Sequence, residues 1–135
     1  MEKSEKELST ISERLMKSHK TVMVVEDLKS NFLLVKALLN PYFNIIWAMN
    51  GMEAIEKART ENVDLILMDV KMPVMGGLDA TKGIREFDKQ VPIIALTAYA
   101  FDSDREAAKE AGCSAFLAKP LKKQELFATI SQVLD

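Results

Sequence analysis

Five short apolar runs, each followed by a stretch with helical spacing, constrain this chain more than any other feature of its sequence. The runs cover residues 21–25, 43–48, 64–68, 91–96 and 115–117. Their apolar residues are continuous, which is typical of a parallel sheet buried on both faces. The helical stretches cover residues 28–39, 52–59, 78–87, 101–111 and 122–134. This alternation predicts an open α/β fold, with helices on both faces of a five-stranded parallel sheet and right-handed crossovers.

Two short signals predict where helices end. Asn40 and Pro41 follow the first helical stretch, and proline cannot continue a helix because it lacks a backbone N–H. Gly112 follows the fourth stretch and is expected to take the left-handed C′ position that glycine adopts most easily.

Residues 1–19 differ from the rest of the chain. They are polar, mixed in charge and free of glycine and proline, with a narrow apolar stripe at Leu8, Ile11 and Leu15 and Met16 beside it. Spacing of i, i+3 and i+7 is typical of a helix or a short coiled-coil seam. Two interpretations stay open, a linker or signalling helix and a frayed N-terminal extension.

Composition excludes several classes of function. The 135 residues carry a net charge of -2, which gives no basic surface for binding nucleic acid and none for an anionic membrane. The apolar runs fall far short of the roughly 20 residues that span a bilayer. With one cysteine, Cys113, no intrachain disulfide is possible. We therefore expect a cytoplasmic protein that neither binds nucleic acid directly nor contacts a membrane through this segment.

Polar and charged residues stand where four of the predicted strands end. The first strand is followed by Glu26 and Asp27, the third by Asp69, the fourth by Thr97 and the fifth by Lys119. The carboxyl ends of parallel strands meet at one edge of the sheet, where such folds bind ligands. We therefore expect three carboxylates, a hydroxyl and an ammonium to lie together.

Three neighbouring carboxylates repel one another unless a cation compensates. Mg²⁺ is the natural partner, because it prefers oxygen ligands and shares its remaining positions with water and phosphate. An aspartate beside such an ion can act as a nucleophile on phosphorus and form an aspartyl phosphate. The phosphoryl oxygens would then need further stabilisation, which Lys119 and the Thr97 hydroxyl could supply.

The chain resembles the response-regulator receiver family, and is most similar to receivers of hybrid sensor histidine kinases. The resemblance rests on the stretches VMVVEDLKSN, WAMNGMEAI, VDLILMDVKMPVMGGLDAT, VPIIALTA and AFLAKPL. It covers residues 20–135 and implies that they form a receiver domain. It implies a flavodoxin-like (βα)5 fold of the CheY type, with strand order 2-1-3-4-5.

The resemblance also implies a role for individual residues. Asp69 matches the phosphoacceptor, and Glu26 and Asp27 match the acidic pair that holds Mg²⁺ with it. Lys71 matches the residue whose backbone carbonyl completes the metal site. Thr97 matches the switch hydroxyl.

Four more positions carry family roles. Lys119 matches the family's catalytic lysine, and the bond from it to Pro120 is expected to be cis. Phe116 matches the aromatic switch residue. Lys71 and Tyr99, each two residues past a site residue, match positions that tune autodephosphorylation. The sequence departs from the family at Gly76, where an aspartate is frequent.

The implied function is a phosphorylation-controlled switch in a two-component phosphorelay. The partner would be a sensor histidine kinase or a histidine phosphotransfer domain, and the only catalysis would be the domain's own phosphorylation and autodephosphorylation, so it is not an enzyme in the ordinary sense. The output surface would lie within residues 101–134, where a homodimer is also possible.

Three other functions fit the sequence less well. A phosphatase of the haloacid dehalogenase type needs a second aspartate two residues after the nucleophile, where this chain has Lys71. An interaction module without phosphorylation would not require the full set of site residues. A nucleotide- or flavin-binding domain would carry a glycine-rich motif after the first strand, and none is present. His19, Cys113 and Trp47 are expected to serve no ligand, Trp47 being a packing residue.

Overall fold

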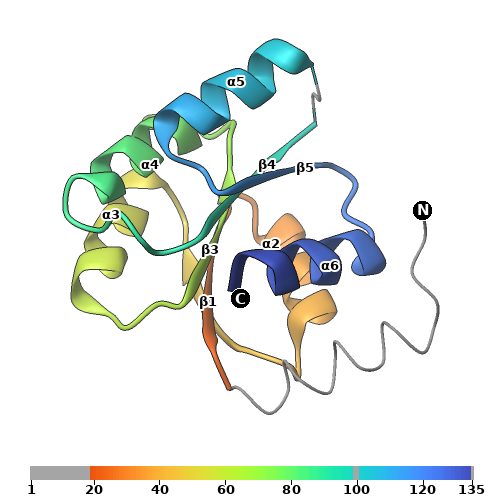
Figure 1. Cartoon of the computed structure of the whole chain (residues 1–135). Coiled ribbons are helices and arrows are strands. Elements are labelled where there is room, and N and C mark those ends of the chain that lie inside the picture. Colours follow the sequence, from red (N-terminus) through yellow and green to blue (C-terminus); the bar gives the residue numbers. More distant parts are fainter. Residues whose placement is uncertain (1–18, 99–100, 135) are drawn as a thin grey trace.

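The computed structural model describes residues 19–98 and 101–134 and contains one five-stranded parallel sheet (Figure 1). Its strands are β1 (Thr21–Val25), β2 (Asn44–Ala48), β3 (Leu65–Asp69), β4 (Ile93–Thr97) and β5 (Ala115–Ala118). They lie in the order β2-β1-β3-β4-β5, and all four pairings are parallel. The predicted fold class and strand order are confirmed.

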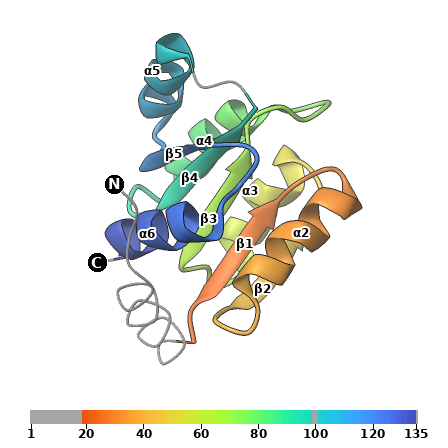
Figure 2. The same ribbon diagram turned by 90° about the vertical axis from the view of Figure 1, so that its right-hand side faces the viewer.

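Within the described residues, five helices cover the two faces of this sheet. They are α2 (Lys29–Leu39), α3 (Gly51–Thr60), α4 (Gly77–Arg85), α5 (Asp102–Ala111) and α6 (Lys123–Leu134). The views in Figures 1 and 2 place α2 and α6 on one face, with α3, α4 and α5 on the other. Among the described residues, no helix is both long enough and apolar enough to cross a membrane.

Each face of the sheet has its own apolar core. Side chains alternate between the faces along each strand, so Val22 and Val24 of β1 pack toward α2 and α6, while Met23 and Val25 pack toward α3 and α4. Every residue of β3 and β4 is buried. The central strands are therefore covered on both sides, as their continuous apolar runs predict.

Helix ends follow the local signals. α2 ends at Leu39, before Asn40 and Pro41, and Gly112 closes α5 with a φ of 109°, the left-handed conformation expected of it. The Asn50 side chain accepts a hydrogen bond of 2.8 Å from the Glu53 N–H, which caps the start of α3. These signals mark where α2 and α5 end and where α3 begins.

Several predicted boundaries were wrong by one or two residues. Residues 91 and 92 lie outside β4, because Pro92 has no N–H to give to a strand ladder. β4 instead extends to Thr97, and β3 extends to Asp69. α4 begins at Gly77 and ends at Arg85, short of the predicted residue 87. The expected helix within residues 1–19 falls almost entirely outside the described part of the chain, as does Tyr99.

Gly77 makes the closest approach of backbone to backbone beside the site. A Cβ at this position would overlap the Asp69 carbonyl oxygen and lie 2.9 Å from the carbonyl carbon. At the neighbouring Gly76, the nearest atom to a Cβ is the Val70 oxygen at 3.4 Å. A side chain is therefore excluded at residue 77 and tolerated at residue 76.

We predict that Gly77→Ala lowers the free energy of unfolding by at least about 2 kcal/mol, because backbone must move to admit the methyl group. Gly76→Ala, the matched control, should change it by less than about 1 kcal/mol. Urea denaturation of both variants measures the difference. Equal effects of the two substitutions would contradict this account of the turn.

Candidate metal and phosphoryl site

The carboxyl ends of β1 and β3 deliver the acidic residues to one edge of the sheet. The Glu26 N–H donates to the Ala48 carbonyl at 3.0 Å, which holds the residue after β1 against β2. Asp69 is the last residue of β3 and is paired with Leu96 of β4. Backbone pairing, rather than flexible loop structure, therefore sets the positions of these two carboxylates.

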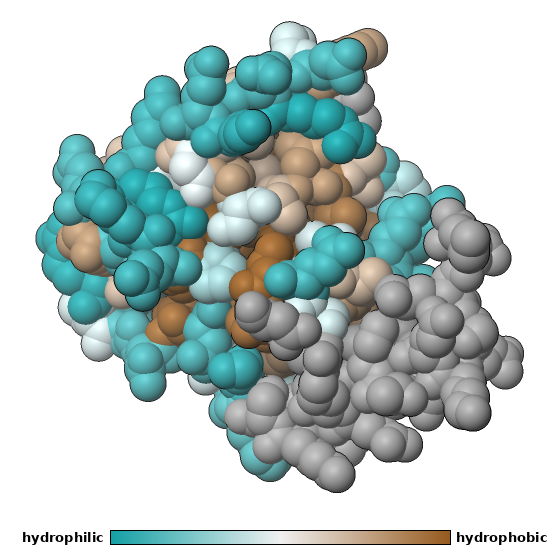
Figure 3. All heavy atoms as spheres, viewed as in Figure 1, coloured by the Kyte–Doolittle hydropathy of each residue, from teal (hydrophilic) through white to brown (hydrophobic). Residues whose placement is uncertain are grey.

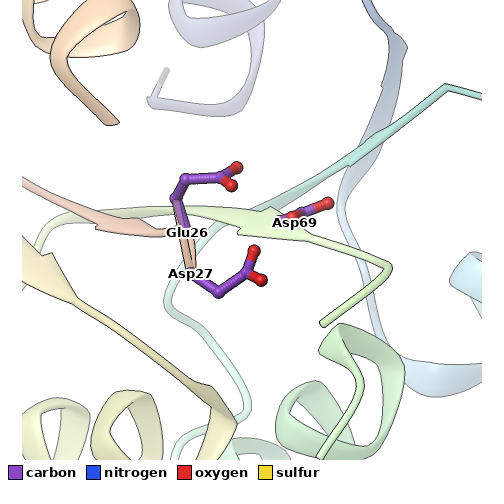
Figure 4. Close-up of side chains that lie close together, drawn as sticks. All are labelled: Glu26, Asp27 and Asp69. Atoms are coloured by element: carbon purple, nitrogen blue, oxygen red, sulfur yellow. The ribbon is translucent and has the colours of Figure 1, made fainter. Parts of the chain in front are cut away.

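Glu26, Asp27 and Asp69 form a compact cluster of carboxylates. One oxygen from each side chain lies within 4.8 Å of the others. Figure 4 shows the three side chains projecting into the same space beyond the strand ends. Glu26 is only 3% exposed and Asp69 5% exposed, while Asp27 is half-buried. The sequence prediction that these residues meet agrees with this geometry.

Lys119 reaches the cluster from the end of β5. Its Nζ lies 3.4 Å from Glu26 Oε2 and 3.3 Å from Asp69 Oδ1. The Lys119 N–H donates to the Thr97 carbonyl at 2.7 Å, which anchors the residue to β4. The peptide bond from Lys119 to Pro120 is cis. One ammonium thus faces two buried carboxylates, with Asp27 beside them.

The pKa of Glu26 is raised above its ordinary value. Burial is the main cause, because it disfavours the charged carboxylate, and the negative charge of Asp69 acts in the same direction. Lys119 lowers the pKa, as do hydrogen bonds from the Leu28 N–H and the Asn31 amide, each 3.3 Å from Oε1. These favourable interactions do not fully offset the cost of burying the charged Glu26 carboxylate, so the cluster favours an added cation.

A cavity of about 220 Å³ opens in front of these groups. Asp69, Thr97 and Lys119 line it together with both residues of the acidic pair. Thr97 is the last residue of β4 and is 4% exposed. The cavity is therefore surrounded by three carboxylates, a hydroxyl and an ammonium.

Other predicted site residues have different surroundings. Lys71 is exposed and borders the cavity, and its N–H donates to Asp69 Oδ1 at 3.3 Å. Phe116 of β5 is half-buried, and the Arg105 guanidinium lies 5.0 Å from its ring centroid. Pro120 is exposed and borders a neighbouring groove. Tyr99 lies outside the described residues.

Two residues at the site were missed from the sequence. Asn31, in the first turn of α2, donates to Glu26 Oε1. Trp47 was expected to pack only, yet its indole N–H donates to the Glu26 carbonyl at 2.8 Å. Asn31 follows the acidic pair by one helical turn, a spacing that could have identified it. Nothing in the local pattern around Trp47 indicates its partner.

The donor set is chemically suited to a hard divalent cation. All three candidate ligands are carboxylates, and oxygen ligands are what Mg²⁺ prefers in proteins. Burial, with the charge of Asp69 acting in the same direction, raises the pKa of Glu26, and a cation beside these carboxylates would favour their charged forms. Glu26, Asp27 and Asp69 could therefore hold Mg²⁺ and leave part of its coordination shell for water or a phosphoryl oxygen.

Known proteins are similar to this chain over most of its length. The family model for the response regulator receiver domain matches residues 22–131. The polar-differentiation response regulator DivK of Brucella anthropi is 37% identical over 118 residues, which cover 85% of this chain and 96% of that protein. The DivK of Brucella ovis is 36% identical over the same length.

Solved structures agree with this match. The chemotaxis protein CheY4 of Vibrio cholerae superposes with a TM-score of 0.81 at 31% identity, over 85% of this chain and 98% of that one. The receiver domain of a sensor histidine kinase from Pseudomonas aeruginosa superposes with a TM-score of 0.79 at 36% identity, over 85% and 97%. That structure has a magnesium ion coordinated in its active-site cleft.

The raised pKa of Glu26 predicts a specific pH dependence. The folded protein holds this proton more tightly than the unfolded chain, whose pKa lies near the ordinary 4.5. Stability is therefore lost as pH rises from that value through the folded pKa. Glu26→Gln removes the penalty, so in EDTA its unfolding midpoint should exceed that of the wild type at neutral pH.

Thermal unfolding followed by circular dichroism between about pH 4 and pH 8 measures this difference, which should shrink toward the acid end. Glu56→Gln, at an exposed position in α3, is the matched control and should change little. A Glu26→Gln variant less stable than the wild type at neutral pH would refute the charge penalty.

Proposed function

The chain belongs to the response regulator receiver family, and we propose that it accepts a phosphoryl group on Asp69 from a histidine of a partner protein. Glu26, Asp27 and Asp69 would hold Mg²⁺ with the Lys71 backbone carbonyl. The observation that carries the proposal is the position of Asp69: buried at the end of β3, in contact with Lys119 and facing a cavity shared with Thr97.

The reaction is a transfer between two nucleophiles. An Asp69 carboxylate oxygen attacks phosphorus, the P–N bond of the phosphohistidine breaks, and its electron pair returns to the imidazole nitrogen. Bound Mg²⁺ would neutralise charge on the phosphoryl oxygens. Lys119 starts 3.3 Å from Asp69 and would pair with a phosphoryl oxygen, while the Thr97 hydroxyl would donate to another. The domain would catalyse only this transfer and its own dephosphorylation.

Phosphorylation would then act as a switch. A phosphoryl group on Asp69 would draw the Thr97 hydroxyl toward it and favour a second arrangement of the β4 and β5 ends. Phe116, on β5, would change its packing in that arrangement. Lys71 at the cavity rim, and Tyr99, would tune how fast water reaches the aspartyl phosphate.

A groove of about 730 Å³ supports docking of the phosphodonor beside the site. Glu26, Asn31, Ala98 and Lys119 line both the groove and the cavity, so the two are continuous. The rest of its wall is mainly apolar and comes from α2 and the loop before α6, at Leu34, Val35, Ala37, Leu38, Pro120 and Leu121. We propose that a helix carrying the phosphohistidine lies in it.

A homodimer through residues 101–134 and a cytoplasmic location remain part of the proposal. In Figure 3, hydrophilic residues cover α5, and more hydrophobic residues reach the surface between α5 and α6. The edge strand β5 lies there, and all four of its residues are half-buried. A partly apolar edge beside a charged helix is a suitable surface for a second copy or for a target.

The function is tested by incubation with Mg²⁺ and acetyl phosphate, followed by intact mass spectrometry. We expect the wild type to gain the mass of one phosphoryl group, and Asp69→Asn or EDTA to abolish the gain. Asp79→Asn, which removes an exposed carboxylate of α4, should still be phosphorylated. Failure of the wild type with both acetyl phosphate and a phosphohistidine donor would favour a pure interaction module.

The groove makes a separate prediction. Leu34, 67% exposed, lines the groove, whereas the adjacent Leu33, 48% exposed, does not. Leu34→Asp should slow transfer from a phosphorylated histidine phosphotransfer domain by at least about tenfold, because it places a charge in an apolar interface. Leu33→Asp should slow it far less, and both variants should react normally with acetyl phosphate. Equal slowing by the two variants would argue against this docking site.

A further inference from the structure

Trp47 joins the second strand to the acidic turn. It lies opposite Val24 in the β1–β2 pairing, and its indole N–H donates to the Glu26 carbonyl at 2.8 Å. Its ring stacks on Phe32 of α2, with centroids 4.5 Å apart and planes 5° from parallel. The Trp47 carbonyl accepts from Lys57 Nζ at 2.6 Å. The residue is thus held through its ring and through its backbone.

The indole N–H of Trp47 binds a backbone carbonyl that belongs to the acidic pair itself. The Glu26 carbonyl and the Asp27 N–H belong to one planar peptide unit, so fixing the carbonyl direction fixes the plane from which Asp27 departs. The Glu26 N–H is already held by Ala48 on β2. With the indole bond, both backbone groups of Glu26 are bound, and the rotation of the acidic pair is constrained.

The side chain of Glu26 is held by the same neighbourhood. Asn31 binds Oε1 and Lys119 approaches Oε2. Phe32, which follows Asn31 on α2, is the residue on which Trp47 stacks. Trp47 therefore touches the acidic turn directly and also packs against the helix that carries Asn31.

We propose that Trp47 is a positioning residue for the divalent-cation site, orienting the Glu26–Asp27 peptide so that both carboxylates face Asp69 before the ion arrives. This inference rests on the proposed Mg²⁺ site. Without the indole donor, the Glu26–Asp27 peptide can rotate. Cation binding must then restrict this rotation, which weakens the binding. The expected result is weaker cation binding with little change in the fold.

A structural role alone would predict something different. Trp47 is half-buried among the apolar residues between the sheet and α2, and a buried indole N–H normally finds some acceptor. If packing were its whole role, a phenyl ring that preserves the stack on Phe32 would retain cation affinity. Trp47→Phe separates the two explanations, because it keeps an aromatic ring and removes the donor.

Isothermal titration of the metal-free protein with MgCl2 tests the proposal. Trp47→Phe should bind Mg²⁺ roughly threefold to tenfold more weakly than the wild type, the effect of one lost hydrogen bond. Ile45→Val, two residues earlier and in the same apolar cluster, is the matched control and should retain wild-type affinity. Thermal unfolding in EDTA measures how much each substitution disturbs the fold.

A second measurement uses the intact chain. Trp47 is the only tryptophan in the sequence, so its fluorescence reports on the acidic turn without a label. Mg²⁺ should change the wild-type emission with the same midpoint as the calorimetric titration, and Asp27→Asn should abolish the change. This readout does not depend on whether Trp47→Phe folds.

The outcomes separate the two proposals. Unchanged affinity in Trp47→Phe, or wild-type binding with silent fluorescence, would overturn the role of Trp47 and leave the proposed function intact. If Trp47→Phe and Ile45→Val both bound Mg²⁺ more weakly, to a similar extent, Trp47 would act through packing alone and the proposal would be wrong. A wild type that binds no Mg²⁺ by calorimetry would overturn the metal site itself, and this inference with it.

Discussion

Burial of two neighbouring carboxylates, Glu26 and Asp69, is the constraint on which the rest of this site depends. Both side chains are almost wholly buried, and Asp27 adds a third charge nearby. Lys119 lies between Glu26 and Asp69 and compensates part of that charge, yet the pKa of Glu26 stays raised. A site that is short of positive charge favours a bound cation, as the proposed function requires.

The fold holds these charges together through backbone structure. Glu26 is bound to β2, Asp69 is paired within β3 and β4, and Lys119 is bound to the Thr97 carbonyl of β4. Close approach of Gly77 to the Asp69 carbonyl fixes the turn beneath the acceptor. Because strand pairing sets the backbone positions of Glu26 and Asp69, their backbones cannot move apart without breaking these pairings. The apolar groove along α2 opens beside the same cavity, where a phosphohistidine would have to arrive.

Sequence patterns predicted the sheet, and which polar residues lie together at its edge, for a physical reason. Continuous apolar runs locate buried parallel strands, and the residues after them, Asp69 and Lys119 among them, must then meet at one edge. Strand ends were less predictable, since Pro92 shortens β4 at one end. Asn31 and Trp47 were missed as site residues because their hydrogen bonds to Glu26 depend on helix placement and strand register. The spacing of Asn31 from the acidic pair could have indicated its role, whereas no local pattern indicates that of Trp47.

The central claim is that these three carboxylates form a cation site that prepares Asp69 for phosphorylation. An anomalous difference map from a crystal grown with Mn²⁺, which replaces Mg²⁺ at oxygen-rich sites, tests it most directly. The account predicts a strong peak between Asp27 and Asp69, with Glu26 facing it directly or through water. A peak elsewhere, or a map without one while Lys119 still bridges Glu26 and Asp69, would contradict the account.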